Sequence, residues 1–155
     1  MISLEDKARR YAVRLLSYRG RSVRELEDRL KRKGFSDDVV ASTVWHLQHA
    51  GLLDDVVLAD ALKREAITTK FMSQYGAKKF MLARGISREI VDSIFRDDET
   101  EDFKNAKRLA DKKMRIIKSL PPEKIKRRLS HLLLRKGYSF ETIQSVLKQI
   151  NVKEV

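Results

Sequence analysis

The sequence predicts an all-α protein made of three tandem three-helix repeats in an elongated, curved array. Three observations support this prediction. The 155 residues include only 6 Gly and 2 Pro, and 42% are hydrophobic, which suits packed helices better than a turn-rich β fold. A seven-residue motif recurs three times at a nearly constant spacing. Apolar residues follow helical spacing around each copy, as expected for small units that stack on their neighbours.

The recurring motif is typical of the end of one helix and the start of the next. Its copies occupy residues 30–36, 81–87 and 133–139, and their glycines are Gly34, Gly85 and Gly137. Glycine readily adopts the left-handed backbone that ends a helix. We expect the apolar residue after each glycine to pack on the residue four positions before that glycine. The serine that follows is expected to cap the next helix.

Apolar faces and capping residues predict the other helices. The faces expected to be buried are Ala8, Tyr11, Ala12, Leu15 and Leu16 in the first repeat, Leu58, Leu62 and Ala66 in the second, and Phe103, Ala106, Ala110, Met114 and Ile117 in the third. Ser22 and Glu25 form a capping box, and Pro121-Pro122 suits a helix start. We therefore expect a single repeat-array domain over 1–155, with repeats at about 4–52, 54–97 and 100–151. The acidic segment 97–102 marks the last boundary between repeats.

The net charge is +12, and it is distributed unevenly. Residues 1–55 and 56–98 each contribute +2, whereas residues 99–155 contribute +8. A positive field concentrated in the last third indicates a polyanionic partner. Cysteine is absent, which excludes disulfides and thiolate metal sites. The sequence has neither a signal peptide nor an apolar run of membrane-spanning length, so we expect a cytoplasmic protein.

Several segments resemble the RecX family of bacterial regulatory proteins, which modulate the recombinase RecA. The matching residues in and after the first repeat are 19–26, Leu30, Lys33-Gly34-Phe35, Gly51-Leu52-Leu53-Asp54-Asp55 and Leu58-Ala59. Those of the second repeat run from Tyr75-Gly76 to Arg84-Gly85-Ile86, and those of the third are 132–138 and Phe140. The resemblance covers nearly the whole chain, and the segment 51–55 is its most discriminating part.

The resemblance implies a function and partners as well as a fold. RecX-like proteins have three tandem three-helix repeats in a curved shape, and they bind the RecA filament on single-stranded DNA. The implied function is inhibition of RecA's ATP hydrolysis, strand exchange and coprotease activities, which modulates recombination, DNA repair and the SOS response. The expected partners are the RecA filament, single-stranded DNA and, more weakly, duplex DNA, and not a membrane. The family also implies no catalysis and no cofactor, and we expect a monomer.

Three groups of basic residues are candidates for contact with RecA or DNA. The first two are stripes on neighbouring helices of the third repeat, formed by Lys104, Arg108, Lys112 and Arg115 and by Lys124, Arg128 and Arg135, with His131 in the second stripe. The third group is Arg19, Arg21 and Arg24, which match the family motif. The alternative is a solvated helix face for the stripes and local pairing with Glu25, Glu27 or Asp28 for the third group.

Two other classes of protein compete with this interpretation. A direct DNA-binding regulator would use the helix pair around Lys33-Gly34-Phe35-Ser36 as a helix-turn-helix and bind duplex in a sequence-dependent way. A hydrolase would use His46, His49 and Asp54, but these residues lack a further ligand at matching spacing, and Asp54-Asp55 is better placed to cap a helix. Trp45 and Tyr11 are expected in the core. We therefore predict no metal site and no enzyme.

Overall fold

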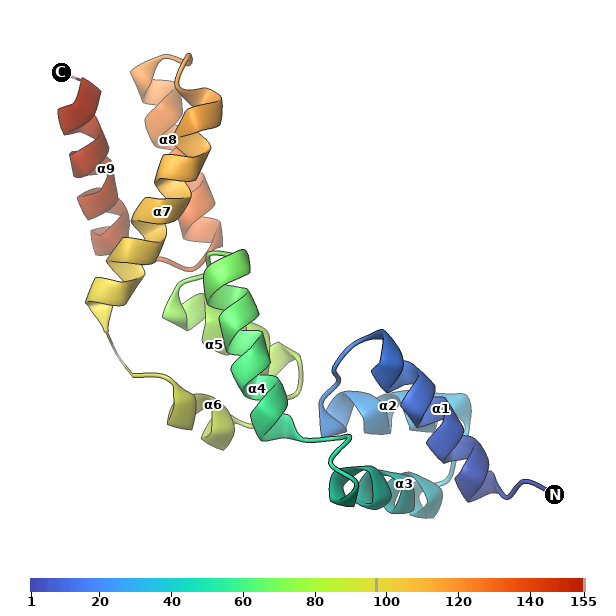
Figure 1. Ribbon diagram of the computed structural model, residues 1–155. Coiled ribbons are helices and arrows are strands. Elements are labelled where there is room, and N and C mark those ends of the chain that lie inside the picture. The colour runs from blue at the N-terminus through green and yellow to red at the C-terminus, as the bar shows by residue number, and fades with distance from the viewer. Residues whose placement is uncertain (97, 155) are drawn as a thin grey trace. The chain divides into compact units, whose positions relative to one another are not determined.

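The computed structural model describes residues 1–96 and 98–154, with Glu99 and residues 151–154 described by their backbone alone. Within these residues the chain forms nine α-helices and no strand (Figure 1), which confirms the predicted all-α class. Asp97, in the predicted boundary segment, lies outside the described residues. None of the described helices combines the length and apolar character that a membrane span requires.

The first repeat consists of α1 (Leu4–Tyr18), α2 (Val23–Lys33) and α3 (Asp37–His49). Its buried core contains Ala8, Ala12, Leu15, Leu26, Leu30, Val40, Val44, Leu47 and Leu53. The predicted capping box is present, because the Ser22 hydroxyl accepts from the Glu25 amide and the Glu25 carboxylate accepts from the Ser22 amide. Asp54 caps the following helix by accepting from the amides of Val56 and Val57, as expected.

Trp45 corrects one expectation, since its side chain is 53% exposed and does not belong to the core. It stacks on His49 with the ring centroids 3.8 Å apart. The buried positions of α3 are Val40, Thr43, Val44 and Leu47, which lie on one helical face. Trp45 follows that face by one residue and therefore points elsewhere. Tyr11 is half-buried against the first core.

All three copies of the motif end a helix as predicted. Gly34, Gly85 and Gly137 have φ values of 105°, 89° and 94°. In each copy, the amide after the glycine donates to the carbonyl four residues before that glycine, and the acceptors are Leu30, Met81 and Leu133. This is the hydrogen-bond pattern of a Schellman motif.

The middle repeat contains α4 (Asp55–Arg64), α5 (Gln74–Ala83) and α6 (Arg88–Ile94). The sequence did not indicate that α4 continues into a π-helical turn, η1 (Glu65–Thr69). Phe71 follows with a positive φ of 55°, which is uncommon for a large side chain. Hydrogen bonds from the third repeat stabilise this irregular segment: Asn105 donates to the carbonyls of Ile67 and Met72, and Tyr138 donates to that of Phe71.

The third repeat consists of α7 (Glu99–Ile117), α8 (Pro122–Arg135) and α9 (Phe140–Glu154). Pro122 occupies the first turn of α8, as predicted. The buried core contains Ala106, Leu109, Ala110, Ile117, Ile125, Leu129, Leu133, Tyr138, Ile143, Val146, Leu147 and Ile150. The Tyr138 hydroxyl also accepts from Asn105, and burial raises the pKa of this tyrosine above its ordinary value.

The substitution Tyr138→Phe is expected to lower the free energy of unfolding by about 1–2 kcal/mol, because the Phe71 carbonyl loses its donor and the Asn105 amide loses one of its three acceptors. Urea unfolding followed by circular dichroism measures the change. The matched control is Tyr75→Phe, because Tyr75 is 63% exposed. Equal stability of the two variants would contradict a structural role for the Tyr138 hydroxyl.

The helices group into two compact units that cut across the middle repeat. One unit contains Met1–Leu62 and Met81–Ser93, and the other contains Lys63–Phe80 and Ile94–Val155. The end of α5 therefore packs with the first repeat, whereas its beginning packs with the third. The limits predicted for the three repeats, and a single domain over 1–155, remain predictions.

Candidate functional site

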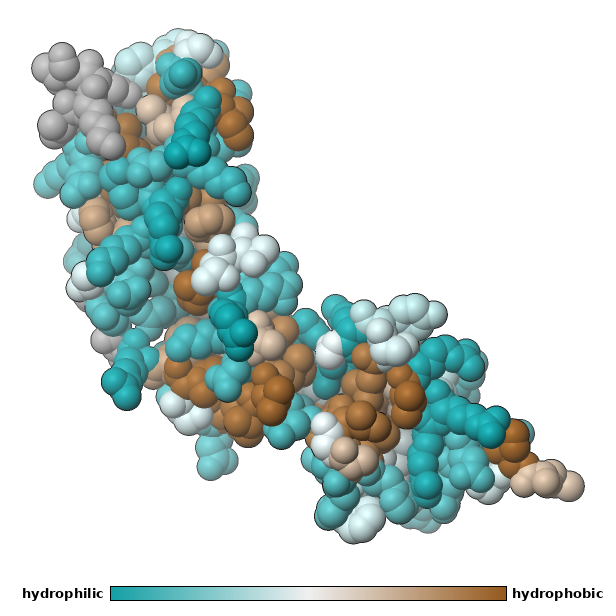
Figure 2. All heavy atoms as spheres, viewed as in Figure 1, coloured by the Kyte–Doolittle hydropathy of each residue, from teal (hydrophilic) through white to brown (hydrophobic). Residues whose placement is uncertain are grey.

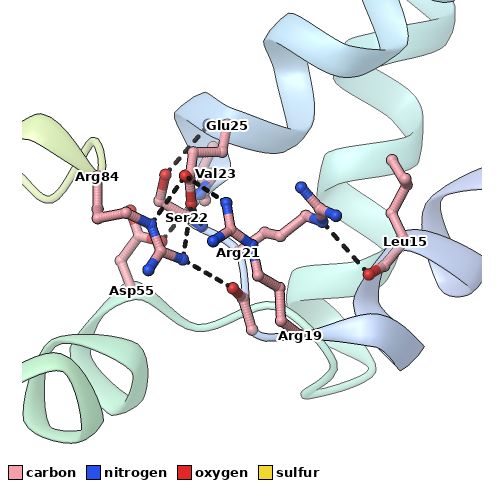
Figure 3. Close-up of polar contacts among 9 residues, drawn as sticks. Leu15, Arg19, Arg21, Ser22, Val23, Glu25, Asp55 and Arg84 are labelled. Atoms are coloured by element: carbon pink, nitrogen blue, oxygen red, sulfur yellow. Dashed lines mark hydrogen bonds and ion pairs between the residues drawn. The ribbon is translucent and has the colours of Figure 1, made fainter. Parts of the chain in front are cut away.

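The first unit contains a close junction between the motif of the middle repeat and the start of α2. A Cβ on Gly85 would lie 2.6 Å from the Ser22 hydroxyl oxygen, so only glycine allows this approach. Arg84 lies beside it and donates from Nε to the Glu25 carboxylate at 2.9 Å and from Nη2 to the Gly20 carbonyl at 3.0 Å (Figure 3). The same carboxylate therefore caps α2 and binds the arginine. We call this set of contacts the first junction.

Burial and hydrogen bonding shift the pKa values of two carboxyl groups in and beside the first junction, in opposite directions. Burial raises the pKa of Glu25, but the hydrogen bonds from Arg84 and the Ser22 amide outweigh it, so that pKa lies below its ordinary value. Asp55 accepts from the Val23 amide at 2.9 Å. Burial nevertheless raises the pKa of Asp55, and the charge of Asp54 adds to the effect. The hydrogen bonds of the first junction therefore favour the charged form of Glu25.

The predicted arginine group divides among three environments. Arg19 pairs with Glu25 at 3.6 Å, so the local-pairing alternative holds for this residue. Arg21 turns away from Glu25 and donates to the Leu15 carbonyl at 3.3 Å (Figure 3). Burial, together with the charges of Arg19 and Arg29, lowers the pKa of Arg21. Arg24 is exposed on α2, and among the described residues its guanidinium makes no ion pair or hydrogen bond.

The second unit contains an equivalent junction between the motif of the third repeat and the start of α5. A Cβ on Gly137 would lie 2.6 Å from the Ser73 hydroxyl oxygen, which caps α5 by accepting from the Gly76 amide. The Ser73 amide donates to the Lys136 carbonyl at 2.9 Å. A Cβ on Gly76 would lie only 2.5 Å from that carbonyl oxygen. We call this set of contacts the second junction.

The two junctions differ at one pair of equivalent positions. Counted from the capping serine, Glu25 and Gly76 occupy the same place, and Arg84 and Lys136 both precede the motif glycine. In the first junction the basic residue pairs with a carboxylate. In the second, glycine replaces the carboxylate, and Lys136 makes no ion pair among the described residues. The charge of Lys136 is therefore left available to a ligand.

Lys136 lines a hollow in the second unit that was not predicted from the sequence. Four lysines surround it, namely Lys70 from the segment after η1, Lys112 and Lys113 from α7, and Lys136 at the end of α8. Its apolar lining is formed by Phe71, Leu109, Ile116 and Leu132. We call this the lysine hollow. Sequence reasoning found Lys112 but missed the other three lysines, although the motif itself contains Lys136 beside Gly137.

The predicted stripe on α7 is exposed over its whole length. Lys104 makes a surface ion pair with Glu101 at 3.8 Å, and Arg108 donates to the Asn105 side chain. Lys112 reaches the lysine hollow, where its ammonium lies 5.4 Å from the centre of the Phe71 ring. Arg115 has no ion-pair partner in the described part of the chain.

The predicted stripe on α8 is also exposed, and includes Lys124, Arg128, His131 and Arg135. Hydrophilic side chains cover much of the third repeat on the face seen in Figure 2, whereas hydrophobic ones gather where α4 begins. There, Val56 and Val57 are 54% and 65% exposed. Among the described side chains, no group of three or more histidine, aspartate or glutamate residues could hold a metal ion. His49 instead donates from Nδ1 to the Trp45 carbonyl at 2.8 Å.

These features define a class, a protein of three-helix repeats whose third repeat presents an exposed, positively charged surface. The chain belongs to the RecX family. It matches the family's first three-helix domain over residues 8–47 and its third three-helix domain over residues 99–147.

Relatives across the chain's length carry the name regulatory protein RecX. The protein of that name from Chlorobaculum tepidum is 29% identical, with 90% of this chain and 86% of the relative aligned. The one from Mycobacterium sp. strain KMS is 31% identical, with 87% and 76% aligned. The name is that of a regulator rather than of an enzyme.

Two solved structures share the fold. The crystal structure of RecX from Lactobacillus salivarius aligns with a TM-score of 0.74 at 21% identity, over 96% of this chain and 97% of that one. A crystal structure of regulatory protein RecX aligns with a TM-score of 0.73 at 22% identity, over 92% and 72%. These structures support the predicted fold of three-helix domains.

Proposed function

We propose that the protein regulates RecA by binding the RecA filament on single-stranded DNA. In this role it inhibits RecA's ATP hydrolysis, strand exchange and coprotease activities, and so modulates recombination, DNA repair and the SOS response. It acts as a cytoplasmic monomer without catalysis or a cofactor of its own. Membership of a family of regulatory proteins named RecX supports this role.

The observation that carries the proposal is the exposed basic surface of the third repeat. Residues 99–155 contribute +8 of the net charge, and both predicted stripes remain accessible to a ligand. A nucleoprotein filament presents phosphates and acidic side chains, to which such a surface is electrostatically complementary. Binding that favours one arrangement of the RecA protomers shifts the filament away from its active cycle.

The packing of the motif glycines favours this role over that of a direct DNA-binding regulator. Gly85 and Gly137 lie against capping serines of other helices, so these helix–turn–helix corners are occupied within the fold. A Cβ on Gly34 would meet no atom within 4 Å, so the corner at Gly34 is the one of the three that stays open. Footprinting on genomic duplex DNA should therefore give no sequence-specific protection, and a specific footprint would favour the direct regulator.

The direct test is RecA's ATP hydrolysis on single-stranded DNA, titrated with the protein and using RecA from the same organism. We expect inhibition far below one molecule per RecA, because a regulator that caps or disassembles a filament need not coat it. Binding to bare single-stranded DNA should weaken steeply as salt rises, since counterions are released. Tight, salt-sensitive DNA binding without inhibition of RecA would overturn the proposal.

Replacing Lys104, Arg108, Lys112 and Arg115 by Glu is expected to weaken binding to the filament by at least about tenfold, because attraction becomes repulsion at each position. Fluorescence anisotropy with labelled DNA inside the filament measures the affinity. The matched control reverses four exposed basic residues of the first repeat, Arg10, Arg14, Lys31 and Arg32, and changes the net charge equally. If both variants lose the same affinity, the stripe on α7 is not the filament-binding site. Circular dichroism verifies that both variants keep their helicity.

A further inference from the structure

The lysine hollow combines unpaired positive charge with accessible apolar side chains. Among the described residues, none of its four lysines forms an ion pair with a carboxylate. Lys112 is exposed, whereas Lys70, Lys113 and Lys136 are half-buried, and all four side chains line the same hollow. Ile116 beside them is 72% exposed. Like charges gathered around a hydrophobic surface destabilise the free protein, and an anionic ligand would relieve that repulsion.

The comparison of the two junctions indicates that this charge is not needed for folding. In the first junction, the residue before the motif glycine is neutralised by Glu25 and contributes a structural ion pair. In the second, the backbone alone makes the contact, through the Ser73 amide and the Lys136 carbonyl. The side chain of Lys136 takes no part in that hydrogen bond. It is therefore free to serve a ligand in the hollow.

The lining of the hollow distinguishes between two kinds of anion. A nucleic acid binds through phosphates and through bases that stack on aromatic rings. The aromatic ring available here, that of Phe71, already carries the Lys112 ammonium 5.4 Å from its centre. The other apolar residues are aliphatic, namely Leu109, Ile116 and Leu132. The sugar–phosphate backbone offers them only deoxyribose carbons between charged phosphates, a smaller apolar group than a leucine side chain. A protein segment offers both carboxylates and aliphatic side chains.

We propose that the lysine hollow binds an acidic segment of a protein partner, whose carboxylates contact Lys70, Lys112, Lys113 and Lys136 while one aliphatic side chain packs on Ile116 and Leu132. The inference rests on the proposed function in one respect, since it assigns this site to the protein component of the filament rather than to its DNA. Apart from Lys112, the residues of the basic stripes remain available for the phosphates.

The test measures binding of three fluorescein-labelled probes to the full chain by anisotropy. The first probe is a short peptide of aspartate and glutamate around one leucine, the second has glycine in place of that leucine, and the third is an oligo-dT strand. The protein variants are Lys113→Gln with Lys136→Gln, the exposed variant Ile116→Ser, and the control Lys118→Gln with Lys126→Gln. The control removes the same charge outside the hollow.

We expect the Lys113→Gln, Lys136→Gln variant to lose about tenfold in affinity for the leucine peptide, because two partly desolvated contacts disappear. The control should lose no more than about twofold, as expected for exposed charges. Ile116→Ser should weaken the leucine peptide by severalfold and leave the glycine peptide unchanged. Oligo-dT should respond equally to both double variants.

Three outcomes of the comparison between probes and variants would overturn the inference. A selective loss of oligo-dT binding in the Lys113→Gln, Lys136→Gln variant would make the hollow a DNA site. Equal losses of peptide binding in both double variants would leave no specific site, and equal binding of the two peptides to the original chain would remove the role of the apolar lining. Inhibition of RecA's ATP hydrolysis by the original chain is measured in a separate assay. If the chain inhibits RecA but does not bind the leucine peptide, the inference is wrong and the proposed function stands. If it binds the peptide but does not inhibit RecA, the proposed function is wrong.

Discussion

Replacing Gly137 by alanine is expected to lower the free energy of unfolding of the second unit by about 3 kcal/mol, because backbone strain and overpacking act together. The φ of 94° costs an L-residue about 1 kcal/mol. The added Cβ would also lie 2.6 Å from the Ser73 hydroxyl oxygen and 3.1 Å from the Cα and N of Gly76. Two of these three atoms belong to the backbone and cannot rotate away.

The matched control for this prediction is Gly34→Ala. Gly34 has an equally unfavourable φ of 105°, but a Cβ there would meet no atom within 4 Å. This variant therefore isolates the strain, and we expect it to cost about 1 kcal/mol. Urea unfolding gives the loss of stability, and hydrogen exchange at the amides of Ser73 and Gly76 assigns it to the second unit. Equal losses in the two variants would show that the contact between Gly137 and Ser73 contributes no stability.

Replacing Glu25 by glutamine is expected to lower the free energy of unfolding by about 2 kcal/mol at neutral pH, because it leaves Arg84 without its charged partner. Both side chains of this pair are shielded, with 15% of Arg84 and 21% of Glu25 exposed. The glutamine oxygen can still accept from the Ser22 amide, so the helix cap is largely kept. The ion pair of Arg19 adds little, because that arginine is 55% exposed.

The same substitution predicts a change in the pH dependence of stability. The pKa of Glu25 is lower in the folded protein than its ordinary value of 4.5. The contribution of Glu25 is therefore fully present above about pH 4.5 and is lost as the pH falls through the folded pKa. Urea unfolding between neutral and acid pH should show this loss in the original chain and not in Glu25→Gln.

Glu5→Gln is the control for the ion pair, since the Glu5 side chain is 54% exposed and its carboxylate lies 4.0 Å from the Arg9 guanidinium. We expect it to change stability by less than about 0.5 kcal/mol at any pH. A double-mutant cycle with Arg84→Gln assigns the effect to the pair. A Glu25→Gln variant as stable as Glu5→Gln would mean that the first junction does not depend on charge.

Local chemistry made the repeats predictable. The motif glycines, their serine caps and the capping box of Ser22 and Glu25 are each determined by a few neighbouring residues, and the structure confirms them. The exposure of Trp45 was predictable in principle from its place beside the face of Val40, Val44 and Leu47. Its size and apolar ring favoured the core, and that expectation was wrong.

Contacts between distant segments were beyond the reach of local patterns. The spacing of Leu58, Leu62 and Ala66 suggested a regular helix, whereas Asn105 and Tyr138 stabilise a π-helical turn and the positive φ of Phe71. The motif likewise gave no sign that Gly85 and Gly137 lie against serines more than sixty residues away along the chain. Local patterns did not predict the lysine hollow either, because its lysines come from three separate segments.

Gly34 leaves a position at which a further repeat could be joined to the amino-terminal side of the chain. A repeat fused ahead of α1 could place its own capping serine against Gly34, where no atom stands in the way. The opposite end offers no such place, because α8 begins at proline without a side-chain cap, and the position matching Ser22 and Ser73 is Ile125, buried inside the helix. Duplication or protein engineering can therefore lengthen this scaffold by the same joint on its amino-terminal side, whereas extension beyond α9 requires a different kind of contact.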